Sequence, residues 1–123
     1  MTTPVERRTR PGELVLVDLE PVRGTEQNGR RPALVVSNDD MHLLARRVII
    51  CPITRNRDAW PTKVMLPAGL AVEGAVLVDQ VRSIDRDARI LRSLGFVPDV
   101  VLAEVRGRLA ALLSLMTDDG TRP

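Results

Sequence analysis

The apolar residues of this chain are gathered into short runs rich in valine, isoleucine and leucine, and turn-forming residues interrupt most of these runs. Runs of about four to eight such residues, bounded by Pro, Gly, Asn or Asp, are typical of β-strands. The sequence predicts strands at Glu13–Leu19, Pro32–Ser37, Arg47–Thr54, Thr62–Leu66 and Gly74–Gln80, with Val81–Asp85 continuing the sheet. No strand alternates regularly with a long helix, so we expect a mainly β fold with α (α+β), built as a small antiparallel barrel.

The last third of the chain changes to the spacing of a helix. Apolar residues recur there every three or four positions, at Val101, Val105, Leu109, Leu112 and Met116. They share one face, and with Pro98 at the first helical position they predict a docking helix of about 18 residues. Shorter helical stretches are expected at residues 39–45 and, capped by Asp85, through Leu91.

The 123 residues correspond to one domain by length. We expect a single domain at residues 10–117, between a flexible N-terminal tail (1–9) and a polar C-terminal tail (118–123). An apolar content of 44% excludes a disordered chain. Cys51 is the only cysteine, so no internal disulfide forms and a reducing, cytoplasmic location is expected. No apolar run approaches the roughly 20 residues that cross a bilayer, so no membrane is expected as a partner.

The basic residues are almost all arginine, since Lys63 is the only lysine among 18. A GC-rich genome explains this bias without any function, whereas guanidinium groups also suit phosphate, which they bind through two parallel hydrogen bonds. Arg46, Arg47, Arg55 and Arg57 are either a phosphate-binding rim or solvated strand ends. Because aromatic residues make up only 2% of the chain, a stacking platform for single-stranded bases is excluded.

Three separated motifs carry a resemblance to a known family. They are GTEQNGRRPALVVSND at residues 24–39, CPIT at residues 51–54 and VDQVRSID at residues 78–85. In order and spacing they resemble the MazF/PemK toxins of type II toxin–antitoxin systems. The resemblance implies an SH3-like barrel of the CcdB/PemK type with a C-terminal helix, a homodimer, and a metal-independent, sequence-specific endoribonuclease that cuts single-stranded RNA. It also implies a cognate antitoxin.

The same resemblance assigns roles to individual residues. Arg31 and Thr54 match the two central catalytic positions, and Glu26 matches a third residue implicated in catalysis or substrate contact. Substrate-binding positions along the RNA path are matched by Thr25, Gln27, Asn38, Gln80, Arg82 and Ser83.

Metal-free cleavage of RNA requires the substrate's 2′-hydroxyl as the nucleophile. The site must therefore neutralise the charge on the phosphorane, take the proton of the 2′-hydroxyl and give a proton to the leaving 5′-oxygen. Arg31 suits the charge on the phosphorane, but because it stays protonated it is a poor general base. We assign the base to Glu26, whose pKa would rise in a partly desolvated cleft, and a hydrogen bond to a phosphate oxygen to Thr54. Cys51 is interpreted as a buried thiol rather than a nucleophile, and the sole histidine, His42, as a surface or packing residue.

No metal or cofactor is expected from the sequence. Two groups offer ligands at short spacing, Asp39-Asp40 with His42 and Asp85 with Asp87, but neither matches a zinc or calcium signature. We interpret each as a helix cap with a neighbouring acid. The chain has no phosphate-cradling glycine loop and no dinucleotide fingerprint.

Two alternative functions remain open, and both lack catalysis. One is a DNA gyrase poison of the CcdB type, although such poisons act through a C-terminal end with a nearby tryptophan and this chain ends in DDGTRP. The other is a catalytically degenerate nucleic-acid-binding module. As for the antitoxin, an arginine-lined cleft that attracts RNA also attracts an acidic, disordered protein segment, so we expect an antitoxin of that kind.

Overall fold

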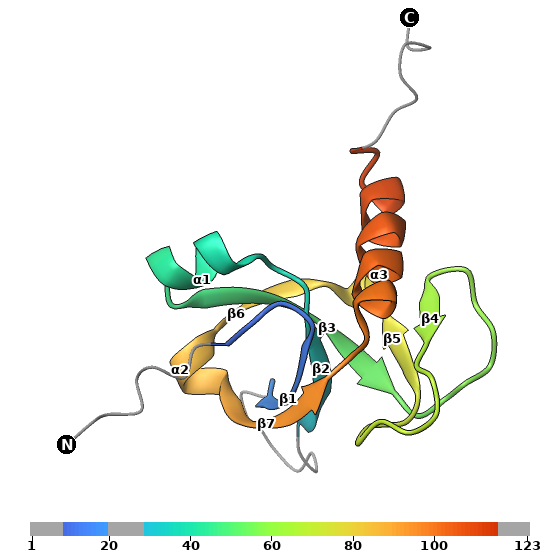
Figure 1. Cartoon of the computed structure of the whole chain (residues 1–123), viewed down its shortest axis with the longest axis horizontal. Coiled ribbons are helices and arrows are strands. Elements are labelled where there is room, and N and C mark those ends of the chain that lie inside the picture. The colour runs from blue at the N-terminus through green and yellow to red at the C-terminus, as the bar shows by residue number, and fades with distance from the viewer. Residues whose placement is uncertain (1–8, 20–28, 116–123) are drawn as a thin grey trace, which may run out of the picture.

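The computed structural model describes residues 9–19 and 29–115. The described chain holds seven strands, β1 (Glu13–Asp18), β2 (Arg30–Val35), β3 (Arg47–Thr54), β4 (Lys63–Met65), β5 (Ala75–Leu77), β6 (Arg82–Asp85) and β7 (Ile90–Phe96). The helices are α1 (Asp39–Leu44), α2 (Arg86–Arg89) and α3 (Asp99–Leu112), with a 3₁₀ turn, η2, at Val78–Gln80. Figure 1 shows α1 and α2 at one end of the curled sheet and α3 with β4 and β5 at the other.

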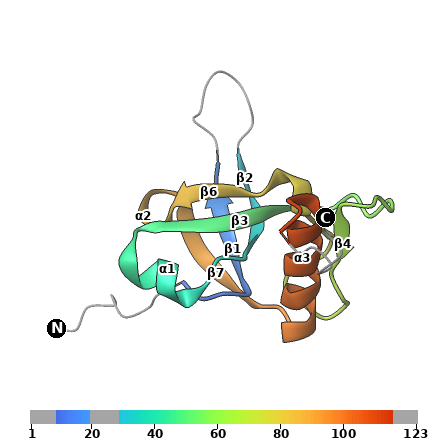
Figure 2. The same cartoon turned by 90° about the horizontal axis from the view of Figure 1, so that it is seen from above.

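All the strand pairs are antiparallel, in the order β4-β5-β3-β2-β1-β7, and β6 pairs with β3 beside this path. β3 is the central strand. It pairs with β2 on one edge, and on the other it pairs first with β6, through Ile50, and then with β5, from Ile53. Pro52 lies between these two partners, at the irregularity that a proline within a strand predicts. The curvature that encloses the sheet's inner face is visible from above in Figure 2.

Two clusters of buried side chains hold the sheet, one on each face. Along β1 the side chains alternate, because successive residues of a strand point to opposite faces. Leu14 packs in the cluster that α3 covers with Val101 and Val105, while Val15 and Val17 pack in the cluster on the other face. The antiparallel β fold with a C-terminal helix is therefore confirmed.

The caps of the two short helices explain where they begin. The Asn38 side chain accepts a hydrogen bond from the backbone N–H of Met41 at 3.0 Å, and Asp85 accepts one from Ala88 at 3.0 Å. This second bond lowers the pKa of the Asp85 carboxyl from its ordinary 3.8, and the nearby Arg46 acts in the same direction. The predicted capping role of Asp85 is thus confirmed. The prediction that the Asp39-Asp40 pair caps α1 was wrong, because Asn38 is the cap and both aspartates lie in the first turn.

Several elements differ from the sequence-based expectation by more than the shifts of one or two residues seen at the ends of the others. The helical turn after Asp85 ends at Arg89, and residues 90–96, which we did not expect to form a strand, are β7. The expected strand at residues 74–80 is shorter, because η2 follows after Leu77. Helix α3 has 14 residues rather than about 18, and Pro98 is its N-cap. Met116, expected on its apolar face, lies outside the described residues, as do the predicted tails apart from Thr9.

Within residues 9–19 and 29–115, no helix is long and apolar enough to span a membrane.

Candidate active site

The register of β2 and β3 relates the two predicted catalytic residues. These strands pair antiparallel, with Val35 opposite Ile50 and Ala33 opposite Pro52. Arg31 and Thr54 stand two residues further along their strands, so continuing the same register places them opposite each other on one face. The recorded pairing stops at Ala33 and Pro52.

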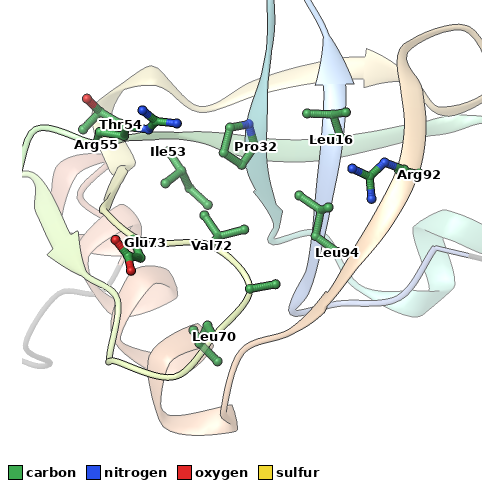
Figure 3. Close-up of a pocket in the computed structure, with 11 residues that line it drawn as sticks. Leu16, Pro32, Ile53, Thr54, Arg55, Leu70, Val72, Glu73, Arg92 and Leu94 are labelled. Atoms are coloured by element: carbon green, nitrogen blue, oxygen red, sulfur yellow. The ribbon is translucent and has the colours of Figure 1, made fainter.

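A pocket of about 490 Å³ opens beside the ends of these strands, as Figure 3 shows. Its apolar wall is formed by Leu16, Pro32, Ile53, Leu70, Ala71, Val72 and Leu94, and its polar groups belong to Thr54, Arg55, Glu73 and Arg92. Thr54 and Arg55 lie at one side of the pocket and Arg92 lies at the other, with Pro32 and Leu16 between them. Arg31 is exposed and adjoins Pro32 in the chain, but it does not line the pocket.

The hydroxyl of Thr54 is held by its neighbours. Its Oγ1 accepts a hydrogen bond from the backbone N–H of Asn56 at 3.1 Å. Because a hydroxyl can accept and donate at the same time, its hydrogen is left to donate to a ligand. Behind it, Thr54 pairs with Ala75 of β5, and Arg57 Nη1 donates to the carbonyl of Gly74 at 3.1 Å, which ties the following loop to β5.

The single lysine of the chain is part of this support. Lys63 Nζ donates to the backbone carbonyls of Asn56 at 3.1 Å and Asp58 at 3.0 Å. It therefore stabilises the turn that follows Thr54.

Most arginines of the described chain form hydrogen bonds or ion pairs within the protein, and four of them form none. Arg46 pairs with Asp85 at 3.4 Å, Arg47 Nε donates to Ser83 Oγ at 3.1 Å, and Arg106 Nε donates to the Val36 carbonyl at 3.0 Å. Within residues 9–19 and 29–115, no side-chain hydrogen bond or ion pair engages Arg31, Arg55, Arg82 or Arg92. Of the four arginines weighed as a phosphate-binding rim, only Arg55 is thus free for an anionic ligand.

The structure places the remaining predicted site residues in different surroundings. Thr25, Glu26 and Gln27 lie outside the described residues. Asn38 caps α1 beyond the far end of β2 from Arg31. Ser83 lies on β6 and binds Arg47, whereas Gln80 and Arg82 are exposed near the start of that strand.

Cys51 and His42 are both buried, so the interpretation of Cys51 as a buried thiol is confirmed, and His42 is a packing residue rather than a surface one. Burial raises the pKa of the Cys51 thiol to about 12, and the charge of Asp79 adds to the effect, so the thiolate that a nucleophile requires is suppressed. His42 is 2% exposed, its Nδ1 donates to the carbonyl of Thr9 at 2.8 Å, and its Nε2 is bonded to Ser37 Oγ. Since a carbonyl only accepts, the Nδ1 atom carries a proton and this imidazole fixes the chain before β1.

Sequence reasoning missed two charged residues of the pocket. Arg92 lies on β7, the strand that was not expected, and Glu73 lies in what was treated as a turn between strands. The signal for Arg92 was the run ILRSLGF, which has strand-like leucine spacing between a short helix and Pro98. For Glu73 we find no signal in the sequence, because only the three-dimensional path of residues 70–74 brings it to the pocket.

No group of three or more His, Cys, Asp or Glu side chains in the described ranges is arranged to hold a metal ion.

Comparisons with known proteins agree with one another. The sequence profile of a family described as "PemK-like, MazF-like toxin of type II toxin-antitoxin system" matches residues 10–113. The chain is 39% identical to the endoribonuclease MazF9 of Mycobacterium tuberculosis, over 86% of this chain and 97% of that protein. It is 36% identical to the endoribonuclease PemK of Escherichia coli, over 84% and 80%. A crystal structure of MazE-MazF from Deinococcus radiodurans aligns with a TM-score of 0.80 and 41% identity, over 88% of this chain and 97% of that one.

Proposed function

The chain belongs to the family of PemK-like, MazF-like toxins of type II toxin–antitoxin systems, and on this premise we propose that it is an endoribonuclease that cleaves single-stranded RNA without a metal ion. The relatives described above carry the name endoribonuclease. We assign the reaction to Arg31 and Thr54, with Glu26 as the base.

The observation that carries this proposal is the unpaired guanidinium of Arg31 on β2, at the position that the continued β2–β3 register sets opposite Thr54. A buried or internally paired arginine would be a structural residue, but Arg31 is exposed and no described side chain neutralises it. Arg55 adds a second unpaired cation beside Thr54. Such an arrangement attracts a phosphodiester and aims hydrogen-bond donors at it.

The cleavage step follows from the chemistry of RNA. The 2′-oxygen attacks the adjacent phosphorus, so an O2′–P bond forms while the P–O5′ bond breaks. Arg31 and the Thr54 hydroxyl stabilise the negative charge that develops on the non-bridging oxygens. Glu26 takes the proton of the 2′-hydroxyl, and a water molecule gives a proton to the departing 5′-oxygen. The products are a 2′,3′-cyclic phosphate and a 5′-hydroxyl.

The test is cleavage of labelled RNA in excess EDTA. We expect Arg31→Ala to lower kcat about 10²- to 10³-fold, and Thr54→Val to act in the same direction, because each change removes a donor aimed at developing charge. Arg46→Gln is the matched control, since it removes one exposed charge at the other end of β3. Cleavage that EDTA abolishes would contradict the metal-free mechanism.

The same experiment separates the alternatives. RNA binding that survives Arg31→Ala without any turnover would favour a catalytically degenerate nucleic-acid-binding module. Intact RNA combined with capture of DNA gyrase would favour a poison of the CcdB type.

The proposal includes the partners and the location. A related structure is a MazE-MazF assembly, and by analogy this chain has a cognate antitoxin. Because free arginines border the pocket, an acidic segment that folds on binding would occlude it. We place the toxin in the cytoplasm, where its RNA substrate is made, and we expect it to act as a homodimer.

A further inference from the structure

Four pocket residues lie in one row across the sheet. In the register of β1 with β7, Leu16 is opposite Arg92, and in the register of β1 with β2, Leu16 is opposite Pro32. Continuing the β2–β3 register adds Ile53. All four residues line the same pocket, and we call this row its floor. Figure 3 shows Ile53, Pro32, Leu16 and Arg92 one after another across the strands.

Both ends of the floor carry a positively charged arginine, and the residues between them are apolar. Arg55 and Thr54 lie at the β3 end, and Arg92 lies at the β7 end. Between them, Leu16 and Pro32 are half-buried, so they offer an apolar surface that water still reaches. An apolar surface between two cations suits a nucleotide chain, whose base faces pack against aliphatic side chains and whose phosphates are anionic.

The floor is long enough for its two ends to contact different phosphates of one RNA strand. Three strand spacings separate β7 from β3, which is about 14 Å at the usual distance between strands. Because Arg92 and Thr54 stand at opposite ends of this row, we assign them to different phosphates of one strand. Arg92 is available, because it is exposed and no side-chain partner within the described ranges engages it.

The surface beyond Arg92 does not favour binding of the RNA backbone. There Arg92 also lines a second cavity of about 310 Å³, whose charged residues include Glu13, Arg86 and Asp87. Arg86 is already paired with Asp87 at 3.2 Å. Two carboxylates and a neutralised arginine do not attract phosphate, so the cationic surface ends at Arg92.

We propose that Arg92 binds a non-scissile phosphate of the RNA backbone and forms a second phosphate subsite at the β7 edge of the sheet. This proposal rests on the proposed function for its ligand. Arg92 is a binding residue that anchors the strand, whereas Arg31 and Thr54 act on the scissile phosphate.

The test uses a substrate RNA and the same oligonucleotide with a single 2′-deoxy sugar at the cleavage position, which is bound but not cut. For Arg92→Gln we expect a roughly tenfold higher Kd and KM with kcat unchanged, as for the loss of one charged hydrogen bond. The slope of log K against log salt should become shallower by about 0.7, the value for one phosphate contact on a single strand. Arg92→Lys should retain most of the salt slope.

Arg46→Gln again serves as the control for a lost surface charge, and unfolding temperatures verify that the variants are folded. Equal affinity and salt slope in wild type and Arg92→Gln would overturn the proposal. So would an equal loss in Arg46→Gln, or a change in oligomeric state without a change in affinity. If the wild type binds with an Arg92-dependent slope but never cleaves, the subsite stands and the nuclease function fails.

Discussion

At the scale of the residue, the existing hydrogen bond of the Thr54 hydroxyl determines what this group can still do for a ligand. Its oxygen accepts the N–H of Asn56, which leaves the hydrogen to donate. Arg31 has no partner among the described residues. These two side chains keep their polar groups available for a ligand, whereas His42, Arg47 and Arg106 use theirs to hold the fold together.

Cys51 gives a prediction at this scale that depends on pH. Because burial raises the pKa of its thiol to about 12, the folded protein holds almost no thiolate at pH 8. We expect iodoacetamide to leave the native protein unmodified at pH 8 and to label it completely in guanidinium chloride, where the thiol regains its ordinary pKa. Mass spectrometry measures the labelled fraction. Rapid labelling of the native protein would contradict the burial of this thiol.

The sequence allowed some site residues to be predicted and not others, for a physical reason. Arg31 and Thr54 belong to contiguous motifs, so their resemblance to a family could be read one segment at a time. Glu73 and Arg92 lie on single isolated positions, and only the register of the strands and the path of a turn bring them to the pocket. The Arg31, Thr54 and Arg92 variants described above test the proposed roles of these residues.

At the scale of the element, the contact between the end of β3 and the residue before β5 fixes the position of Thr54. Gly74 has a φ of +135°, and a Cβ added there would overlap the carbonyl oxygen of Thr54. We expect Gly74→Ala to lower the free energy of unfolding by about 2 kcal/mol or more, since backbone strain alone costs about 1 to 3 kcal/mol. RNA cleavage should fall as well, because Thr54 must move. Thermal unfolding and cleavage rates measure the two effects.

Gly69 provides the matched control for this prediction. It has a φ of +95°, but a Cβ added there meets nothing within 4 Å. Gly69→Ala therefore carries the strain of a positive φ without the overlap, and it should cost less stability and leave cleavage unchanged. Equal losses in the two variants would mean that the approach of Gly74 to Thr54 is unimportant.

Elements with an uninterrupted local pattern were predictable, and those set by tertiary contacts were not. β3 matches its predicted bounds because Arg47–Thr54 is an apolar run with a buried pattern. β7 was missed because Ile90–Phe96 contains exposed Arg92, a half-buried serine and Gly95, and it becomes a strand by pairing with β1. Likewise η2 replaces the end of an expected strand, where Val78 turns into the core below α3.

At the scale of the whole molecule, exposed leucines at the end of α3 bear on assembly. Leu112, Leu113 and Leu115 are 47%, 55% and 68% exposed, in a group that a monomer would leave in water. We expect sedimentation to give twice the chain mass of 13.6 kDa. Leu113→Asp should weaken the dimer about tenfold or more, because it places a charge in an apolar interface.

Leu44→Asp is the control for the dimer prediction. Leu44 is 86% exposed but lies on α1, at the opposite end of the sheet from α3. Its replacement should leave the dimer intact. A protein that sediments as a monomer, or one whose dimer is disrupted only by the change on α1, would contradict the assignment of this interface to α3.

The pairing of the first strand with the last has a consequence for how the toxin is made. Leu16 of β1 can pair with Arg92 of β7 only when nearly the whole domain has been synthesised. Contacts between residues so far apart in the sequence also form slowly. A nascent chain interrupted before Ile90 has an open edge on β1 and lacks one end of the surface proposed to bind RNA. The message being translated is therefore almost fully read before its product is complete enough to attack it.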